Sequence, residues 1–352
     1  MSELRRDPLN ERWVIIAENR AERPNEFTRP AVEQRSLEQR PRDCVFCPGN
    51  EHQTPEALLV RRPANWKGDP AAWRIRVIAN RYPAVEQTAS GVVREGPLHW
   101  SAGGFGVHEV IVDTAQHVTS ITHSSEAEVA ELFEVYRERM LAARSLPEIA
   151  AAMVFKNVGP GGGASIAHAH SQLLATAIPP RDLAEEWRAA ATHFERHGDC
   201  VFCRLMDEAT STGVRLVAQT ESAVAFCPFA ARFPYETWVL PKQHESHLEY
   251  ASESALASVA VLARRIVAGL ERLLDRPAYN YLVHSGPLPG ASAGGKSDRE
   301  RFDANATNSY HWHVEVFPRV TTLAGFELGT GCIINSVAPE RAAEQLRRAV
   351  EC

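Results

Sequence analysis

Two histidines separated by one residue, His168 and His170, follow three glycines in the segment GGGASIAHAHSQ, residues 161–172. Residues two apart in a β-strand point to the same face, so the alternation predicts two imidazoles side by side. A glycine-rich turn lets backbone N–H groups approach a phosphate closely. Gln172 follows on the same face, where its amide can donate to a phosphate oxygen. The segment therefore favours phosphoryl or nucleotidyl transfer onto a histidine, with metal binding as the other use of the pair.

Four of the seven cysteines form two C-x-x-C pairs, each inside the sequence DCVFC. One such pair with two distant histidines would complete a tetrahedral zinc site. A redox couple is the alternative, but the same pair occurs twice, and histidines follow both copies at corresponding places. The residues alone leave these ligand sets open: Cys44 and Cys47 with His117 and either His168 or His170, and Cys200 and Cys203 with His244 and either His311 or His313.

A site of this kind needs only one histidine of each H-x-H pair, so its neighbour is left over. In the first half the spare histidine lies beside the glycine run, which makes it a candidate nucleophile. The alternative is that both histidines of the pair bind metal and neither reacts. Residues 311–315, HWHVE, have no adjacent glycine run and no glutamine. We therefore expect one reacting histidine per chain.

The elements that must position these residues form a pattern that occurs twice. Each copy reads C-x-x-C, β-rich segments, a histidine, a long amphipathic helix, a strand and H-x-H. The pattern predicts long helices over 125–146 and 252–274, the first with a capping box formed by Ser125 and Glu128. We also expect a linking helix over 181–197 and a terminal helix over 338–350. The Gly-, Ser- and charge-rich segment 287–310 is expected to be a mobile surface loop.

Composition narrows the class of protein. The chain has 352 residues, 44% hydrophobic and 23% charged, with a formal net charge of −6. That charge excludes bulk nucleic-acid binding, so an anionic ligand would need a local cluster of donors. The sequence has no apolar run of about 18 residues and no apolar segment after its charged N-terminus. We expect a cytoplasmic protein with no membrane or nucleic-acid partner.

The segment FKNVGPGGGASIAHAHSQ (155–172) resembles the active-site segment of the class I galactose-1-phosphate uridylyltransferases, in the histidine triad superfamily. The resemblance covers essentially the whole chain, because DPLNERWVIIAENRAERP (7–24), VIANRYPA (77–84) and GFELGTGCIIN (325–335) also resemble segments of that family. It implies an α+β fold of two histidine-triad-like halves, each an antiparallel sheet packed with helices. The halves would span residues 1–180, with the nucleophile and the first zinc site, and 181–352, with the second metal site and a hexose-binding segment.

The resemblance also implies roles for single residues. His170 would be the nucleophile, and His168 would bind zinc with Cys44, Cys47 and His117. Gln172 would bond the transferred phosphate, and Glu327 would hold sugar hydroxyls. The remaining substrate contacts it implies are Asn157, Gly163 and Ser165 at phosphate and nucleotide, Asn80 and Arg81 at ribose and base, and Arg20 and Arg23 at phosphate across the interface of a homodimer.

Two departures from the family pattern bear on the substrate. Ala169 and Ser171 stand where the uridylyltransferases carry Pro and Gly, and this motif is closer to the ADP-glucose phosphorylase branch. In that branch the transferred unit is AMP, and inorganic phosphate can accept it. The resemblance therefore implies transfer of UMP or AMP between a nucleotide sugar and a hexose 1-phosphate or phosphate. The alternatives are a dinucleoside polyphosphate hydrolase or phosphorylase and a zinc-stabilised nucleotide-binding protein without catalysis.

The second metal has two candidate ligand sets, and both metals are expected to be structural. A second zinc site would use Cys200, Cys203, His244 and His311. An iron-type site, as in some family members, would use Glu186, His284, His311 and His313. Two thiolates favour zinc over iron held by carboxylate and imidazole, so the first set is preferred.

Overall fold

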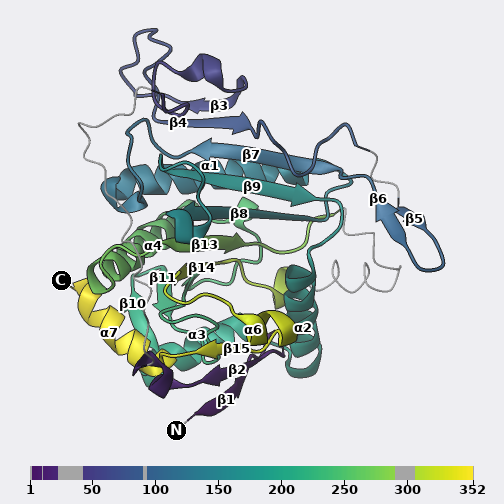
Figure 1. The fold of residues 1–352 in the computed structure, drawn as a ribbon, viewed down its shortest axis with the longest axis vertical. Helices are drawn as coiled ribbons and strands as arrows, with labels where there is room; N and C mark the ends of the chain where they lie inside the picture. The colour runs from purple at the N-terminus through teal and green to yellow at the C-terminus, as the bar shows by residue number, and fades with distance from the viewer. Residues whose placement is uncertain (1, 10, 23–42, 90–92, 290–305, 352) are drawn as a thin grey trace.

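A ten-stranded antiparallel sheet runs through the computed structural model, which describes residues 2–9, 11–22, 43–89, 93–289 and 306–351 (Figure 1). The strands lie in the order β10-β11-β12-β14-β13-β8-β9-β7-β4-β3. Their bounds are β3 Ala57–Arg61, β4 Ile75–Ala79, β7 Gly106–Val112, β8 Ala151–Val158, β9 His170–Thr176, β10 Leu216–Gln219, β11 Ala223–Phe226, β12 Thr237–Pro241, β13 Tyr279–His284 and β14 His313–Pro318.

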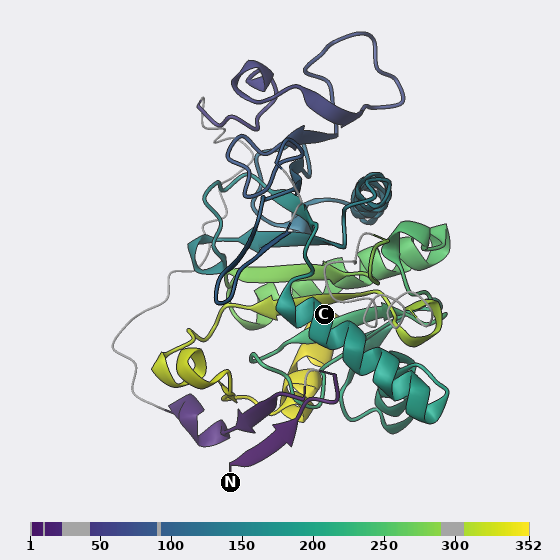
Figure 2. The same ribbon diagram turned by 90° about the vertical axis from the view of Figure 1, so that its right-hand side faces the viewer.

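Two long helices, α1 (Glu126–Arg144) and α4 (Glu253–Leu273), pack against each other on one side of this sheet (Figure 2). Their apolar faces and the strands beneath them form the main core, in which Phe133, Tyr136 and Ile266 are fully buried. The C-terminal helix α7 (Pro339–Glu351) extends this layer beside α4 and β10. A second core lies under α2 (Arg181–His197) and α3 (Val201–Thr212) and includes Trp187, Phe202 and Trp238.

The strand register decides which side chains share a face. Gln172 of β9 lies opposite Phe155 of β8, which lies opposite Leu282 of β13, which in turn lies opposite Glu315 of β14. Residues directly opposite on neighbouring strands point to the same face. His170 and Gln172 therefore share a face with His313 and Glu315, whereas Ser171 points to the opposite face, where it contacts Tyr136 of α1.

Three smaller elements flank the large sheet. Strands β1 (Glu3–Arg6) and β2 (Trp13–Ile16) form a hairpin, and β15 (Ile333–Asn335) adds to it in parallel. The short helix α6 (Gly325–Thr330) precedes β15, and β5 (Val93–Glu95) pairs with β6 (Trp100–Ala102). In Figures 1 and 2, α6 and the three-stranded sheet lie at the end of the molecule away from β7 and β9.

The mixed α+β class with antiparallel sheets is confirmed, and so are the four helices expected from the sequence. The expected capping box is present, because Ser125 accepts from the Glu128 N–H while the Glu128 carboxylate accepts from the Ser125 N–H. Of the loop expected at 287–310, residues 290–305 lie outside the described residues. In the part of the chain that the structure describes, no helix is both long and apolar enough to cross a bilayer.

One local prediction was wrong. The strand begins at His170, so His168 lies in the bend before it rather than on the same strand face. The main chain explains this, because Ala169 between the two histidines donates to Val118 O and accepts from Asp113 N. The segment before β9 is thus bonded to the loop after β7.

Candidate active site and metal clusters

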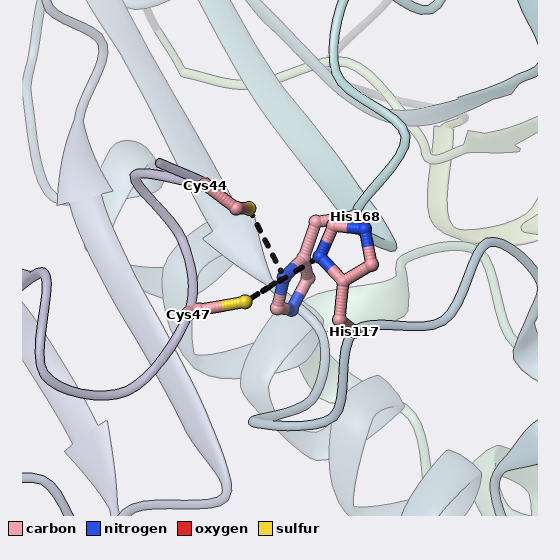
Figure 3. A group of neighbouring side chains, drawn as sticks. All are labelled: Cys44, Cys47, His117 and His168. Carbon is pink, nitrogen blue, oxygen red and sulfur yellow. Dashed lines mark hydrogen bonds between the residues drawn. The ribbon is translucent and has the colours of Figure 1, made fainter. Parts of the chain in front are cut away.

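The first Cys/His cluster lies next to the start of β9 and consists of Cys44, Cys47, His117 and His168 (Figure 3). The Sγ atom of Cys47 lies 3.4 Å from Nδ1 of His117 and 3.6 Å from Nδ1 of His168. Zinc bonds of about 2.3 Å to sulfur and about 2.0 Å to nitrogen, at a tetrahedral angle, separate S and N by about 3.6 Å. The donor set and its spacing therefore fit a tetrahedral zinc ion.

The hydrogen bond of His168 to the main chain leaves the ring nitrogen that faces the cysteines unprotonated and able to bind a metal. Its Nε2–H donates to Thr114 O at 2.8 Å, so Nδ1, which faces the cysteines, carries the lone pair. Burial lowers the pKa of His168 to about 4, and the backbone bond to Thr114 opposes that shift only in part. A neutral imidazole is the form that binds a metal.

Cys200, Cys203, His244 and His311 form a second cluster of the same composition. The Sγ atom of Cys203 lies 3.4 Å from Nδ1 of His244 and 3.5 Å from Nδ1 of His311. Nε2–H of His244 donates to Thr307 O at 2.9 Å, which repeats the arrangement at His168. Both C-x-x-C pairs thus meet two imidazoles, and the donors again fit zinc.

The alternative iron-type set is divided between two places. His311 lies with the cysteines, whereas Glu186, His284 and His313 form a separate buried group with Glu315. Nδ1 of His284 lies 3.3 Å from a Glu186 oxygen, and Nε2 of His313 lies 3.9 Å from an oxygen of Glu186 and of Glu315. Arg232, which is partly buried, is ion-paired with Glu315. A positive side chain thus already neutralises one carboxylate of this group.

His170 lies at the start of β9, and one of its ring nitrogens donates a hydrogen bond while the other carries a lone pair. Its Nδ1–H donates to His168 O at 2.8 Å, which leaves the lone pair on Nε2. Burial lowers its pKa, and the positive charge of Lys156 acts in the same direction. An imidazole that is neutral, fixed in one tautomer and carries a directed lone pair is suited to attack phosphorus.

The backbone carbonyl of His170 accepts a hydrogen bond from a buried ion pair. Lys156 of β8 is fully buried, forms a short hydrogen-bonded pair with Asp113 and donates to His170 O at 3.2 Å. Ser171 donates to the same Asp113 oxygen at 3.2 Å, and Tyr136 of α1 contacts Ser171 at 2.6 Å. The sequence analysis missed Lys156 and Asp113. One feature of the sequence could have indicated them. Lys156 is a charged residue at a position of strand 151–158 where the alternation of buried and partly buried residues places a buried side chain.

The glycine turn between β8 and β9 is built on two left-handed residues. Gly159 has φ +72° and Gly163 has φ +84°, values that side-chain-bearing residues rarely adopt. Asn280 of β13, also missed, donates to Gly162 O and to the side-chain oxygen of Asn157, both at 2.7 Å. Asn280 therefore ties the turn to Asn157 on the neighbouring strand.

Beside this turn lies a cleft of about 970 Å³, which Asn157, Ser165 and His168 help to line. Arg319 and Thr322, which follow β14, also line it, whereas His170 and Gln172 are not among its lining residues. Gly163 and Ser165 are exposed, so a ligand can approach the turn and the Ser165 hydroxyl, although the N–H of Gly163 already donates to Pro160 O at 3.0 Å. The cleft is large enough for a nucleotide sugar.

The remaining predicted substrate contacts divide into two groups. Asn80 follows β4 on the face that carries Gln172, and its Nδ2 lies 3.1 Å from Nε2 of His108. Arg81 is exposed, and its guanidinium lies 3.5 Å from Gln53 O. Arg20 and Glu327 lie near β2 and β15, and the Glu327 carboxylate accepts from Ala324 N at 3.0 Å. A single chain therefore does not bring Arg20 and Glu327 to His170. Arg23 lies outside the described residues.

Comparison with known proteins identifies the family. Residues 1–180 match the family model "Galactose-1-phosphate uridyl transferase, N-terminal domain". The chain is 31% identical to an ADP-glucose phosphorylase of Arabidopsis thaliana over 349 residues, 98% of this chain and 92% of the relative. It is 26% identical to a galactose-1-phosphate uridylyltransferase of Thermotoga maritima, over 99% of this chain and 98% of that one.

Solved structures agree with this similarity. An ADP-glucose phosphorylase from Arabidopsis thaliana, solved with bound ADP-glucose, superposes with a TM-score of 0.80 at 29% identity over 99% of this chain and 98% of that one. A uridylyltransferase structure shares the fold, with a TM-score of 0.72 at 24% identity, covering 100% of this chain and 99% of the other. The chain is thus an enzyme of the galactose-1-phosphate uridyl transferase family.

Proposed function

We propose that this enzyme is a hexose-1-phosphate nucleotidyltransferase that works through a covalent nucleotidyl-His170 intermediate. The observation that carries this proposal is His170 itself. Its Nδ1–H is donated to His168 O, so Nε2 is left as a nucleophile on the face that carries Gln172, beside the exposed glycine turn. The substrates are a nucleotide sugar and a sugar 1-phosphate or inorganic phosphate, and the transferred unit is UMP or AMP.

The reaction has two displacement steps. The lone pair on Nε2 of His170 attacks the α-phosphorus of the nucleotide sugar, the P–N bond forms and the bond to the bridging oxygen breaks. The sugar 1-phosphate leaves with that oxygen. A phosphate oxygen of the second substrate then attacks the same phosphorus, the P–N bond breaks and His170 returns to its neutral form. Two half-reactions of this kind produce ping-pong kinetics.

The other predicted residues act on the bound substrate. Gln172 and Ser165 donate to the phosphate oxygens, where charge develops in the transition state, and Gly163 has no side chain to block the approach of the phosphate to the turn. Asn157 contacts phosphate and nucleotide, and Asn80 and Arg81 lie beside the ribose and base.

A homodimer would complete the site. Arg20, Arg23 and Glu327 of a second copy would supply phosphate neutralisation and contacts to the sugar hydroxyls. The distance along the molecule between α6 and β9 in Figure 1 supports this arrangement, because one chain does not bring the two regions together.

A second candidate function is ADP-glucose phosphorylysis, in which AMP is transferred and inorganic phosphate is the acceptor. Identity of 31% to the Arabidopsis ADP-glucose phosphorylase over 98% of the chain favours it. Ala169 and Ser171 within the H-x-H-x-Q motif also favour it. The two candidates share His170 and differ in base and acceptor.

Zinc is the metal proposed for both Cys/His clusters. It would hold Cys44, Cys47, His117 and His168 at the first site and Cys200, Cys203, His244 and His311 at the second. Zinc supplies no reacting group there, because four protein ligands fill its tetrahedral shell. Its role is to fix the ends of the segments that carry the ligands. We also propose two histidine-triad-like halves, 1–180 and 181–352, and a cytoplasmic location.

The test is a donor panel of UDP-, ADP- and GDP-sugars, each labelled in the phosphate that would be transferred. Wild-type protein should retain label after brief incubation with its true donor, and His170→Ala should retain none and lose turnover by several orders of magnitude. Absence of label on wild-type protein with every donor would overturn the proposal. Release of product with inorganic phosphate alone selects phosphorylysis, and a requirement for a sugar 1-phosphate selects the transferase. Cleavage of dinucleoside polyphosphates in preference to any nucleotide sugar would favour the hydrolase alternative.

A further inference from the structure

His108 is the histidine nearest Gln172 that the proposed chemistry does not use. It lies on β7, where His108 pairs with Leu174 and Val110 pairs with Gln172, so His108 and Gln172 are diagonal neighbours on one face. Nε2 of His108 is 2.9 Å from Oε1 of Gln172. The other ring nitrogen, Nδ1, lies 3.0 Å from the backbone nitrogen of Ala84. Both nitrogens of this ring therefore have a defined partner.

The backbone partner decides which nitrogen carries the proton. The N–H of Ala84 can only donate, so Nδ1 of His108 must accept and carries the lone pair. The hydrogen of a neutral ring is then on Nε2, which must donate. The opposite tautomer would set Nδ1–H against the Ala84 N–H.

Gln172 is the acceptor for that hydrogen. Asn80 also lies near Nε2, at 3.1 Å, but its own oxygen already accepts from the N–H of Tyr82 at 2.9 Å. The group that Asn80 turns to the ring is therefore NH2, which cannot accept. Among the described residues, the oxygen of the Gln172 amide receives the Nε2–H of His108.

We propose that His108 is a positioning residue that fixes the orientation of the Gln172 amide, so that Gln172 presents NH2 rather than oxygen to the transferred phosphate. This inference rests on the proposed function. A flipped amide would point a carbonyl oxygen at a phosphate oxygen, and the two would repel. The chain of contacts starts at the Ala84 N–H and passes through the imidazole to the amide. It ties the turn after β4, predicted to hold ribose and base, to the group that holds the phosphate.

The first experiment reads the tautomer without substrate. Protein labelled with ¹⁵N-histidine is studied by long-range ¹H–¹⁵N correlation, and His108 is assigned by the signal lost in His108→Gln. We expect a protonated Nε2 and an unprotonated Nδ1. The reverse tautomer would overturn the inference, whether or not the protein turns over any donor.

The second experiment measures the rate of nucleotidyl-His170 formation in single turnovers. His108→Leu should slow this step about 10–100-fold, because one donor to the transition-state phosphate is misaligned. The Kd for the nucleotide sugar should change much less. His108→Gln should recover most of the lost rate, since its amide can accept from Ala84 N and donate to Gln172. His197→Leu, at the exposed end of α2, is the matched control and should react like wild type.

A double-mutant cycle separates positioning from a general structural effect. If His108 acts through Gln172, the variant with both His108→Leu and Gln172→Ala should be no slower than Gln172→Ala alone, within about twofold. Multiplicative losses would overturn the inference. Absence of nucleotidyl-His170 in the wild type would instead refute the proposed function, and the tautomer would then decide the arrangement at His108.

Discussion

At the scale of single residues, His170 and His313 lie on the same face of the sheet but are covered by different side chains. Both have Nδ1 beside the carbonyl of the residue two before, at 2.8 Å for His170 and 3.0 Å for His313. The ring of Phe202 lies 5.0 Å from that of His313, and Trp238 lies at 5.3 Å, so α3 and β12 close over it. His170 has Phe46 at 5.3 Å and the glycine turn beside it. Of these two histidines, only His170 therefore combines a directed lone pair with an adjacent glycine turn.

Asn280 supplies a prediction at this scale. Its NH2 group donates both hydrogens, to Asn157 and to Gly162 O, and Asn280→Asp removes both while keeping the shape. We expect kcat/KM to fall about tenfold or more, because small displacements of a positioned group are costly. Steady-state kinetics with the true donor would measure this.

Asn280→Ala is the control for the added charge in that experiment. Both variants should lose activity if the donated hydrogens hold the turn. Unchanged kcat/KM in both would show that the turn keeps its shape without Asn280.

At the scale of elements, the strands around the nucleophile are joined through charged side chains as well as through their ladders. Lys156 of β8 reaches Asp113, just after β7, and His170 O at the start of β9. Arg139 of α1 pairs with Glu109 of β7 at 2.6 Å, which attaches the covering helix to the same strand. The position of His170 therefore depends on three strands and one helix.

Lys156→Met should be strongly destabilising, because it leaves the Asp113 carboxylate buried without its cation. We expect the free energy of unfolding to fall by about 3–5 kcal/mol, as measured by equilibrium unfolding in urea. The double variant Lys156→Met, Asp113→Leu should recover most of that loss, since no unpaired charge remains. A double variant as unstable as Lys156→Met would refute the ion-pair explanation.

Asp7, directly after β1, supplies a pH prediction. Burial raises its pKa to about 6, and the N–H of Leu9 and the charge of Arg232 oppose the shift, whereas Glu236 and Glu186 add to it. The folded state thus binds more protons than the unfolded state between the ordinary pKa of 3.8 and about 6. Its contribution to stability is present below pH 3.8 and is lost as pH rises to about 6.

Asp7→Asn should remove that loss, since the amide stays neutral and its oxygen can still accept from Leu9. A shift of about 2 pKa units corresponds to about 3 kcal/mol, so the variant should be more stable than wild type by that order at pH 7. At about pH 3, below the ordinary pKa of 3.8, the difference should vanish. Urea unfolding at several pH values measures it, and a pH-independent difference would contradict the assignment.

At the scale of the whole molecule, the predicted contacts lie in two regions that one chain keeps apart. The proposed nucleophile, His170, lies on β9, and Glu327 lies on α6 beside β15. In the proposed dimer, α6 of one copy would meet β9 of the other, and a two-fold axis would create that contact twice.

Subunit complementation tests this arrangement. His170→Ala and Glu327→Ala should each lose activity, and their equal co-expression should restore about a quarter of the wild-type rate. Half of the dimers are then mixed, and each mixed dimer has one intact site. Activity no higher than the sum of the two separate variants would contradict a shared site.

Much of the chemistry could be predicted from residue types and spacing. Two C-x-x-C pairs, each followed by a histidine and H-x-H, indicated two clusters of thiols and imidazoles, because these groups at such spacing have few other uses. The residues alone left open which histidine of each H-x-H pair joins its cluster. The long helices were predicted from apolar periodicity and a capping box, which are local properties. The glycine run indicated a tight turn, and the structure has positive φ angles at Gly159 and Gly163, which residues with side chains rarely adopt.

The tertiary structure alone decided what depends on neighbours distant in the sequence. Strand register places His108 diagonal to Gln172, Asn280 against the glycine turn and Lys156 under His170, and no local pattern specifies that register. His311 joins the cysteines while Glu315 joins His313, although both lie in one short segment. Such choices come from long-range pairing and from which face a helix covers, so only the folded chain reveals them.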